Sequence, residues 1–130
     1  MSDQINVPIS PGELVDKITI PEIKKEFITD NNKLKNINHE YDLLMQIYID
    51  NISKTEGIAN LKKQLKEINL ELWEIEDKIR DCEREKSFTD IFIELARSVY
   101  FTNDKRSQIK LKINLLLNSK LVEEKSYKDY

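Results

Sequence analysis

The chain has 130 residues, of which 39% are hydrophobic and 35% are charged, and it contains only 2 Gly and 3 Pro. This length suits one domain. So few glycines and prolines exclude a many-stranded sandwich or barrel, which needs a turn about every 8–12 residues, and they favour a few long helices. The formal net charge of −3 argues against a nucleic-acid-binding protein, which usually carries a basic surface.

The sequence also argues against a membrane protein and against a metal site. No apolar run approaches the about 18 residues of a membrane span, and the N-terminal segment lacks the apolar stretch of a signal peptide. One Cys and one His cannot form a common zinc site, and no glycine-rich phosphate loop occurs. We therefore expect a cytoplasmic protein with no metal, no cofactor, no nucleic acid and no membrane among its partners.

The first predicted helix covers about Pro11–Phe27. Ser10 can cap its N-terminus, and Glu13 would complete a capping box. A proline inside a helix lacks the N–H that the preceding turn needs, at a cost of about 3 kcal/mol or more. Pro21 therefore predicts a kink or a restart of the helix near Thr19–Pro21.

A second helix is predicted to begin after Asp30, which can act as its cap, and to fade near Asn51. The polar run Ser53–Gly57 is the predicted linker to the rest of the chain. Outside the helices, residues 1–9 are predicted to be an extended lead-in. A single helical domain then covers 10–118, and residues 119–130 form a C-terminal extension with a frayed end.

The third and fourth predicted helices carry apolar stripes with alternating spacings of three and four residues, and a second capping box places the start of the fourth helix at Ser87. If the chain folds back at Lys86–Ser87, the two stripes match layer by layer. The predicted fold is therefore all-α: a long antiparallel helical hairpin, about 58–86 and 88–118, packed with two shorter N-terminal helices in a bundle-like arrangement. The predicted layers pair Phe92 with Cys82, Leu95 with Ile79, Val99 with Ile75, Thr102 with Leu72, Arg106 with Ile68, Ile109 with Leu65, Ile113 with Leu61 and Leu116 with Ile58.

A two-helix hairpin of this length buries too little surface by itself. It would also overhang the two shorter helices, so we expect a homodimer with a coiled-coil-like hairpin.

The stripe of the fourth helix is interrupted by Thr102 and Arg106. A guanidinium that faces a core keeps its charge and needs carboxylates or bound anions around it. Three interpretations follow. Arg106 reaches the edge of the hairpin or pairs with an acidic residue; it holds a small anion; or a partner protein supplies the carboxylate. Asp16 and Glu22 on the first helix are candidate intramolecular partners.

Other polar residues lie near Arg106 at helical spacing, and the hairpin register places Asp77 level with Arg97 and Trp73 level with Tyr100. These residues form either a ligand site or a second packing face with an edge salt bridge. The candidate ligand-binding residues are Arg106, Lys110, Arg97, Asn103, Asp104, Tyr100, Trp73, Asp77 and Arg80.

Four segments resemble a family of small bacterial and phage proteins that is catalogued only as a domain of unknown function. They are SPGELVDKITI-EIK (10–24), INLELWEIEDKIRDCE (68–83), FIELARSVYFTNDKRSQIKLKIN (92–114) and LVEEKSY (121–127). The resemblance implies that the candidate residues other than Lys110 belong to the family's motif, and it links the family to surface-polysaccharide genes. This chain departs from the family pattern at Pro21, where the family would carry Leu.

Two functions follow from these observations. The first is a non-enzymatic interaction or adaptor protein that acts as a homo-oligomer. The alternative is a binder or enzyme for a small anionic ligand, held between helices by Arg106, Lys110 and Arg97 as in chorismate-mutase-like helical sites. That ligand could belong to surface-polysaccharide metabolism.

Overall fold

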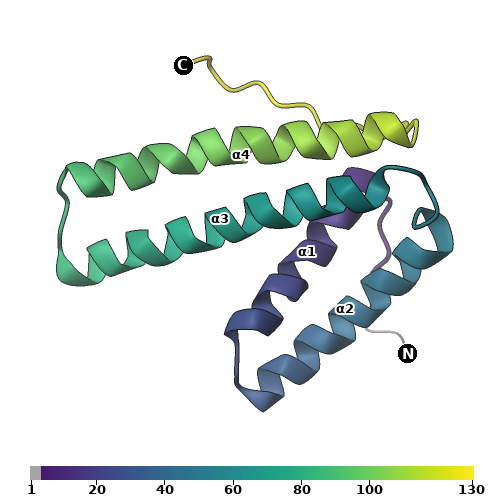
Figure 1. Cartoon of the computed structure of the whole chain (residues 1–130), viewed down its shortest axis with the longest axis horizontal. Helices are drawn as coiled ribbons and strands as arrows, with labels where there is room; N and C mark the ends of the chain where they lie inside the picture. Colours follow the sequence, from purple (N-terminus) through teal and green to yellow (C-terminus); the bar gives the residue numbers. More distant parts are fainter. Residues whose placement is uncertain (1–3) are drawn as a thin grey trace.

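The computed structural model describes residues 4–130, and this range contains four helices and no strand. They are α1 (Pro11–Phe27), α2 (Asn31–Asn51), α3 (Ile58–Glu85) and α4 (Asp90–Leu116). Figure 1 shows two antiparallel helical hairpins, α1–α2 and the longer α3–α4, set at an angle to each other. The predicted all-α, bundle-like fold with a long C-terminal hairpin is confirmed. None of the helices in the described range is both long and apolar enough to cross a membrane.

The first two helices begin at the residues predicted to cap them. The Ser10 hydroxyl accepts a hydrogen bond from the Glu13 N–H at 3.2 Å, and the Asp30 carboxylate accepts one from the Lys33 N–H at 2.9 Å. The reciprocal half of the first capping box is a wrong prediction. The Glu13 carboxylate pairs with Lys110 on α4 instead, because a largely buried ammonium needs a counter-charge more than the half-buried Ser10 N–H needs an acceptor.

The predicted start of the fourth helix is also wrong. The helix α4 begins at Asp90, with Thr89 as its cap and no side-chain capping bond. The reason lies in the end of α3, where Lys86 takes a left-handed backbone conformation with φ of 54° and the Ser87 N–H donates to the Cys82 carbonyl at 2.9 Å. Ser87 therefore helps to terminate α3 and is not available to start α4.

The helix α1 continues through Pro21. Of the two predicted alternatives at this position, a kink or a restart, the restart is wrong. Pro21 is buried, as are Val15, Ile18 and Ile23 on either side of it. In the described chain α1 is the one helix that packs against all three others. This burial on several sides offsets the cost of the missing hydrogen bond, because tertiary packing stabilises a helix more than local propensity does. The core around α1 consists of Leu14, Val15, Ile18, Tyr48, Ile52, Ile58, Leu65, Ile109 and Ile113.

A glycine allows α1 to approach α4 closely. A Cβ on Gly12 would lie 2.5 Å from the backbone oxygen of Lys110, a distance that real side chains do not reach. The Gly12 N–H donates to the Asn114 Oδ1 at 2.7 Å, which satisfies one of the free donors at the start of the helix. The beginning of α1 is therefore fixed directly on the last turns of α4.

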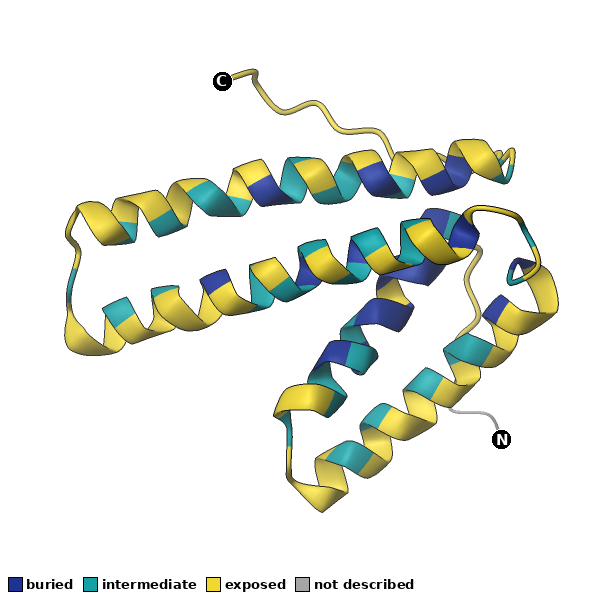
Figure 2. Ribbon diagram, in the orientation of Figure 1, coloured by how far each residue is buried: buried dark blue, intermediate teal, exposed yellow. Residues whose placement is uncertain are grey.

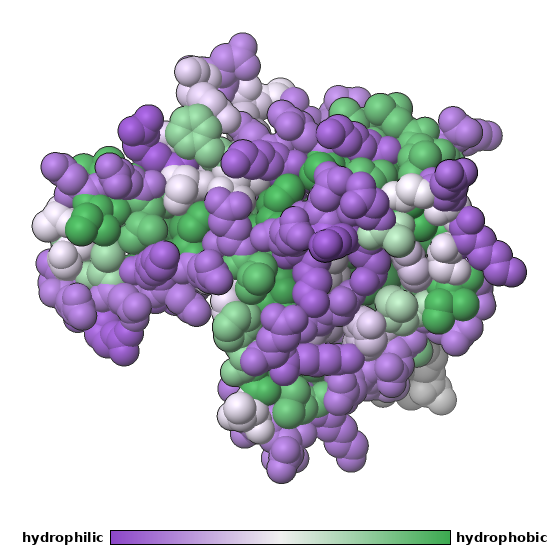
Figure 3. All heavy atoms as spheres, in the orientation of Figure 1, coloured by the Kyte–Doolittle hydropathy of each residue, from purple (hydrophilic) through white to green (hydrophobic). Residues whose placement is uncertain are grey.

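The side chains of the α3–α4 hairpin become less buried beyond the point at which α1 ends. Phe27, the last residue of α1, stacks on Trp73 at 5.4 Å between ring centroids. On the α1 side of this contact, the stripe residues Leu65 and Ile113 are fully buried. Beyond it lies the outer hairpin (residues 76–99), where the stripe residues are at most half-buried and Ile91 is 67% exposed (Figure 2). Figure 3 shows hydrophobic side chains at the surface of this end of the molecule.

The C-terminal tail (residues 118–130) has no helix or strand and runs back along α4 (Figure 1). The reversal occurs at Asn118, which has a φ of 53°, and at Ser119, whose N–H donates to the Asn114 carbonyl at 2.9 Å. The tail contacts α4 through side chains, and these contacts bring it into the candidate site.

Candidate functional site

Arg106 forms an ion pair with Asp16, one of the two intramolecular partners predicted for it. Its Nε donates to the Asp16 Oδ1 at 3.0 Å, and its Nη2 donates to Oδ2. The Asp16 side chain is 3% exposed, whereas the Arg106 side chain is 32% exposed. Glu22, the other candidate, instead pairs with Lys62 and Lys66 on α3. Two parallel hydrogen bonds between a guanidinium and a carboxylate give a strong, directional contact.

The ion pair belongs to a buried polar network that joins α1, α3 and α4. The Asn69 amide donates to the Asp16 Oδ1 at 2.8 Å and to the Thr19 hydroxyl at 2.7 Å. The Thr19 hydroxyl in turn donates to the Asp16 backbone carbonyl at 2.7 Å. No buried side-chain nitrogen or oxygen in the described part of the chain lacks a hydrogen-bond partner. A fully satisfied network of this kind fixes the position of one helix relative to its neighbours.

The electrostatics of the network keep Arg106 charged. The hydrogen bond that Arg106 donates to Asp16 raises the pKa of Arg106, and this effect outweighs the burial that lowers it. For Lys110, burial lowers the pKa, but the hydrogen bonds to Glu13 and Glu123 and the negative charges of Asp16 and Glu13 together raise it. Both side chains therefore carry a positive charge at neutral pH, and carboxylates of the chain itself neutralise them.

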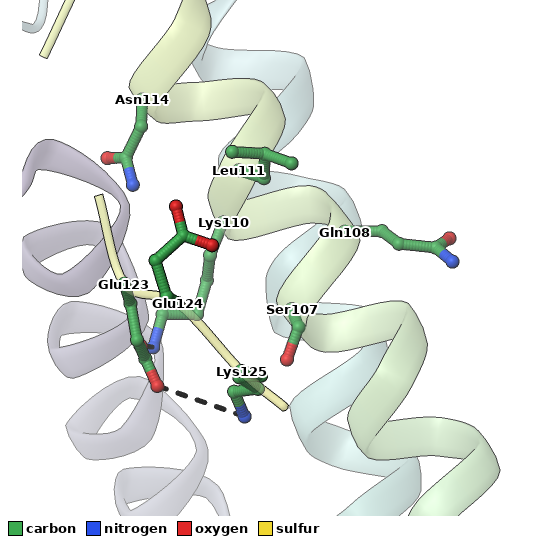
Figure 4. Close-up of a pocket in the computed structure, with 8 residues that line it drawn as sticks. All are labelled: Ser107, Gln108, Lys110, Leu111, Asn114, Glu123, Glu124 and Lys125. Atoms are coloured by element: carbon green, nitrogen blue, oxygen red, sulfur yellow. Dashed lines mark hydrogen bonds and ion pairs between the residues drawn. The ribbon is translucent and has the colours of Figure 1, made fainter. Parts of the chain in front are cut away.

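Lys110 lies one turn beyond Arg106 and touches a pocket of about 220 Å³ between the tail and α4 (Figure 4). Its Nζ is 2.7 Å from the Glu13 Oε2, 3.0 Å from the Glu123 Oε2 and 3.9 Å from the Asp16 Oδ2. The Lys110 side chain is only 12% exposed. The pocket is lined by Ser107, Gln108, Lys110, Leu111, Asn114, Glu123, Glu124 and Lys125.

A second cluster lies further along α4, where the predicted site residues Tyr100 and Asp104 contact Tyr130, the last residue of the tail. The Tyr130 ring lies 4.6 Å from the Phe101 ring, in an edge-to-face arrangement, and 5.4 Å from the Tyr100 ring. The Tyr130 hydroxyl donates to the Asp104 carboxylate, and the Arg97 guanidinium lies 5.9 Å from the Phe101 ring. We call Tyr100, Phe101 and Asp104 the tyrosine socket.

The remaining predicted site residues lie outside both clusters. Trp73 packs against Phe27, Asn103 is half-buried on α4, and Arg80 is exposed, 3.8 Å from Glu76. Asp77 is exposed, and no ion pair joins it to Arg97 within residues 4–130.

Arg97 and Lys110 belong to different clusters. They lie thirteen residues apart on the continuous helix α4, or roughly 20 Å at about 1.5 Å per residue. The structure therefore brings Arg106 and Lys110 together but does not bring Arg97 to them, and one small molecule would not span the separation.

Sequence reasoning missed Asn114 and Glu123, and it gave no partner to Asn69. A signal for the first network was present, because Asp16 interrupts the apolar segment Leu14–Ile20 just as Arg106 interrupts the stripe of α4. No comparable signal marks Glu123, which lies in a polar tail among other charged residues.

The helices and the tail together match one family model. The match covers residues 5–130, and the model is that of a family of unknown function, DUF6165. This chain belongs to that family. The matched range of DUF6165 includes both hairpins, the Asp16 network and the tail with Tyr130, so the resemblance to a family of unknown function is confirmed over nearly the whole chain. No curated protein and no solved structure matches the chain.

Proposed function

We propose that this DUF6165 protein is an interaction protein that works as a homodimer and uses the outer hairpin as its contact surface. The observation that supports this function is the change of burial along the two facing apolar stripes of the α3–α4 hairpin. Where α1 covers them, Leu65 and Ile113 are fully buried, whereas the stripe residue Leu95 of the outer hairpin is only half-buried. Beside the stripe of α4, Ile91 and Ile93 are each more than half exposed. A second outer hairpin would supply the missing apolar layer.

The chemistry of that surface fits a second copy of the chain. Full burial of a large apolar side chain contributes about 1.5–3 kcal/mol, so a few such residues on each copy give a sizeable driving force. A two-fold symmetric contact uses the same surface on both copies, and two helical hairpins packed in this way form a four-helix arrangement. The outer hairpin offers exposed apolar side chains for this contact, Phe88 and Ile91 among them.

The Asp16 network supports a structural role for Arg106 over a catalytic one. The guanidinium donates two hydrogen bonds to Asp16, which is itself held by Asn69. Its charge is therefore neutralised inside the molecule, and its main effect is to hold the α1–α2 hairpin on the α3–α4 hairpin. Correct placement of α1 in turn decides which part of the long hairpin is left uncovered.

The test is the mass in solution, measured by sedimentation equilibrium over a range of protein concentrations. We expect the unmodified chain to be a dimer and Ile91→Glu to be a monomer with unchanged helix content. Leu115→Glu is the matched control, because Leu115 is exposed to a similar extent, 64%, but lies at the other end of α4. A monomeric unmodified chain at high concentration, or equal weakening by the two variants, would contradict the proposed function.

A second candidate function is binding of a small carboxylate or phosphate compound at Lys110. It is favoured by one observation: the buried Lys110 ammonium borders the 220 Å³ pocket and is paired there with Glu123, a residue of the tail. An anionic group of a ligand could replace the Glu123 carboxylate. Arg97 takes no part in this version of the site.

The second candidate is tested by thermal unfolding with inorganic phosphate, sugar nucleotides and dicarboxylates. A ligand that binds the folded state raises the melting temperature with concentration. We expect Lys110→Met to abolish the rise and Lys105→Met, a change at an exposed lysine of the same helix, to leave it intact. If no compound raises the melting temperature, or if both variants respond equally, the candidate is wrong.

A further inference from the structure

The tail is held on α4 by few contacts, so it can leave α4 and bind to a second copy of the chain. The hydrogen bonds and ion pairs that join residues 120–130 to α4 come from only two side chains, Glu123 on Lys110 and Tyr130 on Asp104. All residues from Lys120 to Tyr130 are exposed. A segment without backbone pairing or burial of its own opens at low cost, because few contacts break when it leaves.

The tyrosine socket contains what is needed to recognise a phenol side chain. The Tyr130 and Phe101 rings meet edge to face, the Tyr100 ring lies beside Tyr130, and the Asp104 carboxylate accepts a hydrogen bond from the Tyr130 hydroxyl. Aromatic pairs of this geometry contribute beyond simple apolar burial, and a hydrogen bond to a charged acceptor is stronger than one between neutral groups. The other tyrosine of the tail, Tyr127, is 77% exposed, and the Lys125 ammonium lies 5.6 Å from its ring centroid.

The socket lies at the border of the outer hairpin, the surface proposed for dimer contact. Tyr100 and Phe101 directly follow residues 76–99 on α4, and both are still partly exposed. A tail of about twelve residues can reach roughly 40 Å when extended, which is more than the width of a packed helix pair. The tail of one copy can therefore reach the socket of a second copy that is packed beside it.

We propose that the tyrosine socket is the docking site for the tail of a second copy, so that two chains exchange their tails when they associate. This inference rests on the proposed homodimer, and it adds the tail as a second contact between the two copies. Exchange replaces the contacts of Tyr130 with identical ones on the second copy and therefore costs little, as in other swapped dimers. The two tails would then link the copies in addition to the apolar surface, and each linked contact strengthens the other.

The socket is tested first, independently of association. A fluorescently labelled peptide with the sequence of residues 119–130 is titrated with the full-length Tyr130→Ala protein, whose own tail leaves the socket open, and anisotropy reports binding. We expect the Tyr127→Ala peptide to bind as the unmodified peptide does and the Tyr130→Ala peptide to bind at least tenfold more weakly. Equal binding of the two variant peptides, or no binding of the unmodified one, would overturn the assignment of the socket.

Exchange is tested by mixing two full-length variants that carry complementary defects. Tyr130→Ala keeps the socket but loses the tyrosine, and Phe101→Ala keeps the tyrosine but loses a wall of the socket. We expect each variant alone to associate at least tenfold more weakly than the unmodified chain, and the mixture to associate more tightly than either, since a mixed pair has one intact contact only if tails cross between copies. A mixture no tighter than its components overturns the exchange. The peptide titration still reports on the socket if the chain proves to be a monomer, so failure of the dimer is distinguishable from failure of the socket.

Discussion

Arg106 on α4 and Asp16 on α1 form a two-bond ion pair across the contact between the two hairpins, and the Asp16 side chain is almost completely buried. The two partners differ in burial, because the Arg106 side chain is still 32% exposed. The carboxylate cannot exchange its partners for water, whereas the guanidinium can still reach solvent. Loss of Arg106 would therefore leave a buried carboxylate short of donors, whereas loss of Asp16 would leave a guanidinium that water can partly solvate.

We expect Asp16→Asn to destabilise the protein by about 2–3 kcal/mol. The change leaves the charge of Arg106 without its counter-charge, and breaking a buried pair costs about 3–5 kcal/mol, a value reduced here because Arg106 is partly exposed. Urea unfolding followed by circular dichroism measures the loss. Asp81→Asn, which removes an exposed pair with Arg84, is the control and should change stability by less than about 0.5 kcal/mol. Equal effects of the two variants would show that the Asp16 network contributes little.

Gly12→Ala should destabilise the fold by about 1–3 kcal/mol, because the new Cβ would overlap the Lys110 backbone oxygen and force α1 away from α4. Gly57→Ala is the comparison. At Gly57 a Cβ meets open space apart from Leu116 at 3.8 Å, but the φ of 91° is unfavourable for alanine, at a cost of roughly 1 kcal/mol. Denaturant unfolding of both variants measures the free energy of unfolding. It compares the steric effect at Gly12 with the backbone effect at Gly57. A Gly12 variant as stable as the unmodified chain would mean that the two helices do not approach this closely.

The contact between Glu123 and Lys110 should depend on pH. Lys110 lowers the pKa of Glu123 below its value of 4.5 in the unfolded chain, so the contact contributes stability above about pH 4.5 and loses it as the pH falls through the lower, folded pKa. The difference in melting temperature between the unmodified chain and Glu123→Gln should therefore be present at pH 7 and shrink as the pH falls below about 4.5. Its size corresponds to less than about 1 kcal/mol, because Glu123 is half exposed. Glu124→Gln serves as the control and should show no such pH dependence.

Trp73 is the only tryptophan of the chain and reports on the end of α1. Its ring is stacked on Phe27, with 18° between the two planes. Phe27→Ala should move the tryptophan emission to longer wavelength, since the indole gains contact with water, and should cost about 0.5–1.5 kcal/mol. Phe88→Ala removes an aromatic contact with Phe92 at the far tip of the hairpin and should leave the emission unchanged. An unchanged spectrum for Phe27→Ala would indicate that α1 ends short of Trp73.

Much of the architecture follows from local sequence signals. Ser10 and Asp30 cap the first two helices as predicted, and the bounds Pro11–Phe27 and Asn31–Asn51 match the predicted ones. The alternating apolar spacing is enough to predict the long hairpin, because a helix repeats about every 3.6 residues and one stripe can face only one side. Arg106 marks the polar network for the same reason, since a charge inside a stripe must have a partner.

What the local pattern cannot supply is the outcome of competition between segments that are distant in the chain. Glu13 could accept a hydrogen bond from the backbone at the start of α1, but its carboxylate binds Lys110 instead. The sequence after Ser87 resembles a capping box, but Ser87 takes part in the end of α3. Pro21 remains within one helix because packing on several sides outweighs a local cost of a few kcal/mol. Helix positions and stripes were thus determined by the sequence through short-range geometry. The partners of Asp16, Lys110 and Tyr130 were decided only by the tertiary structure, because they depend on which helices meet.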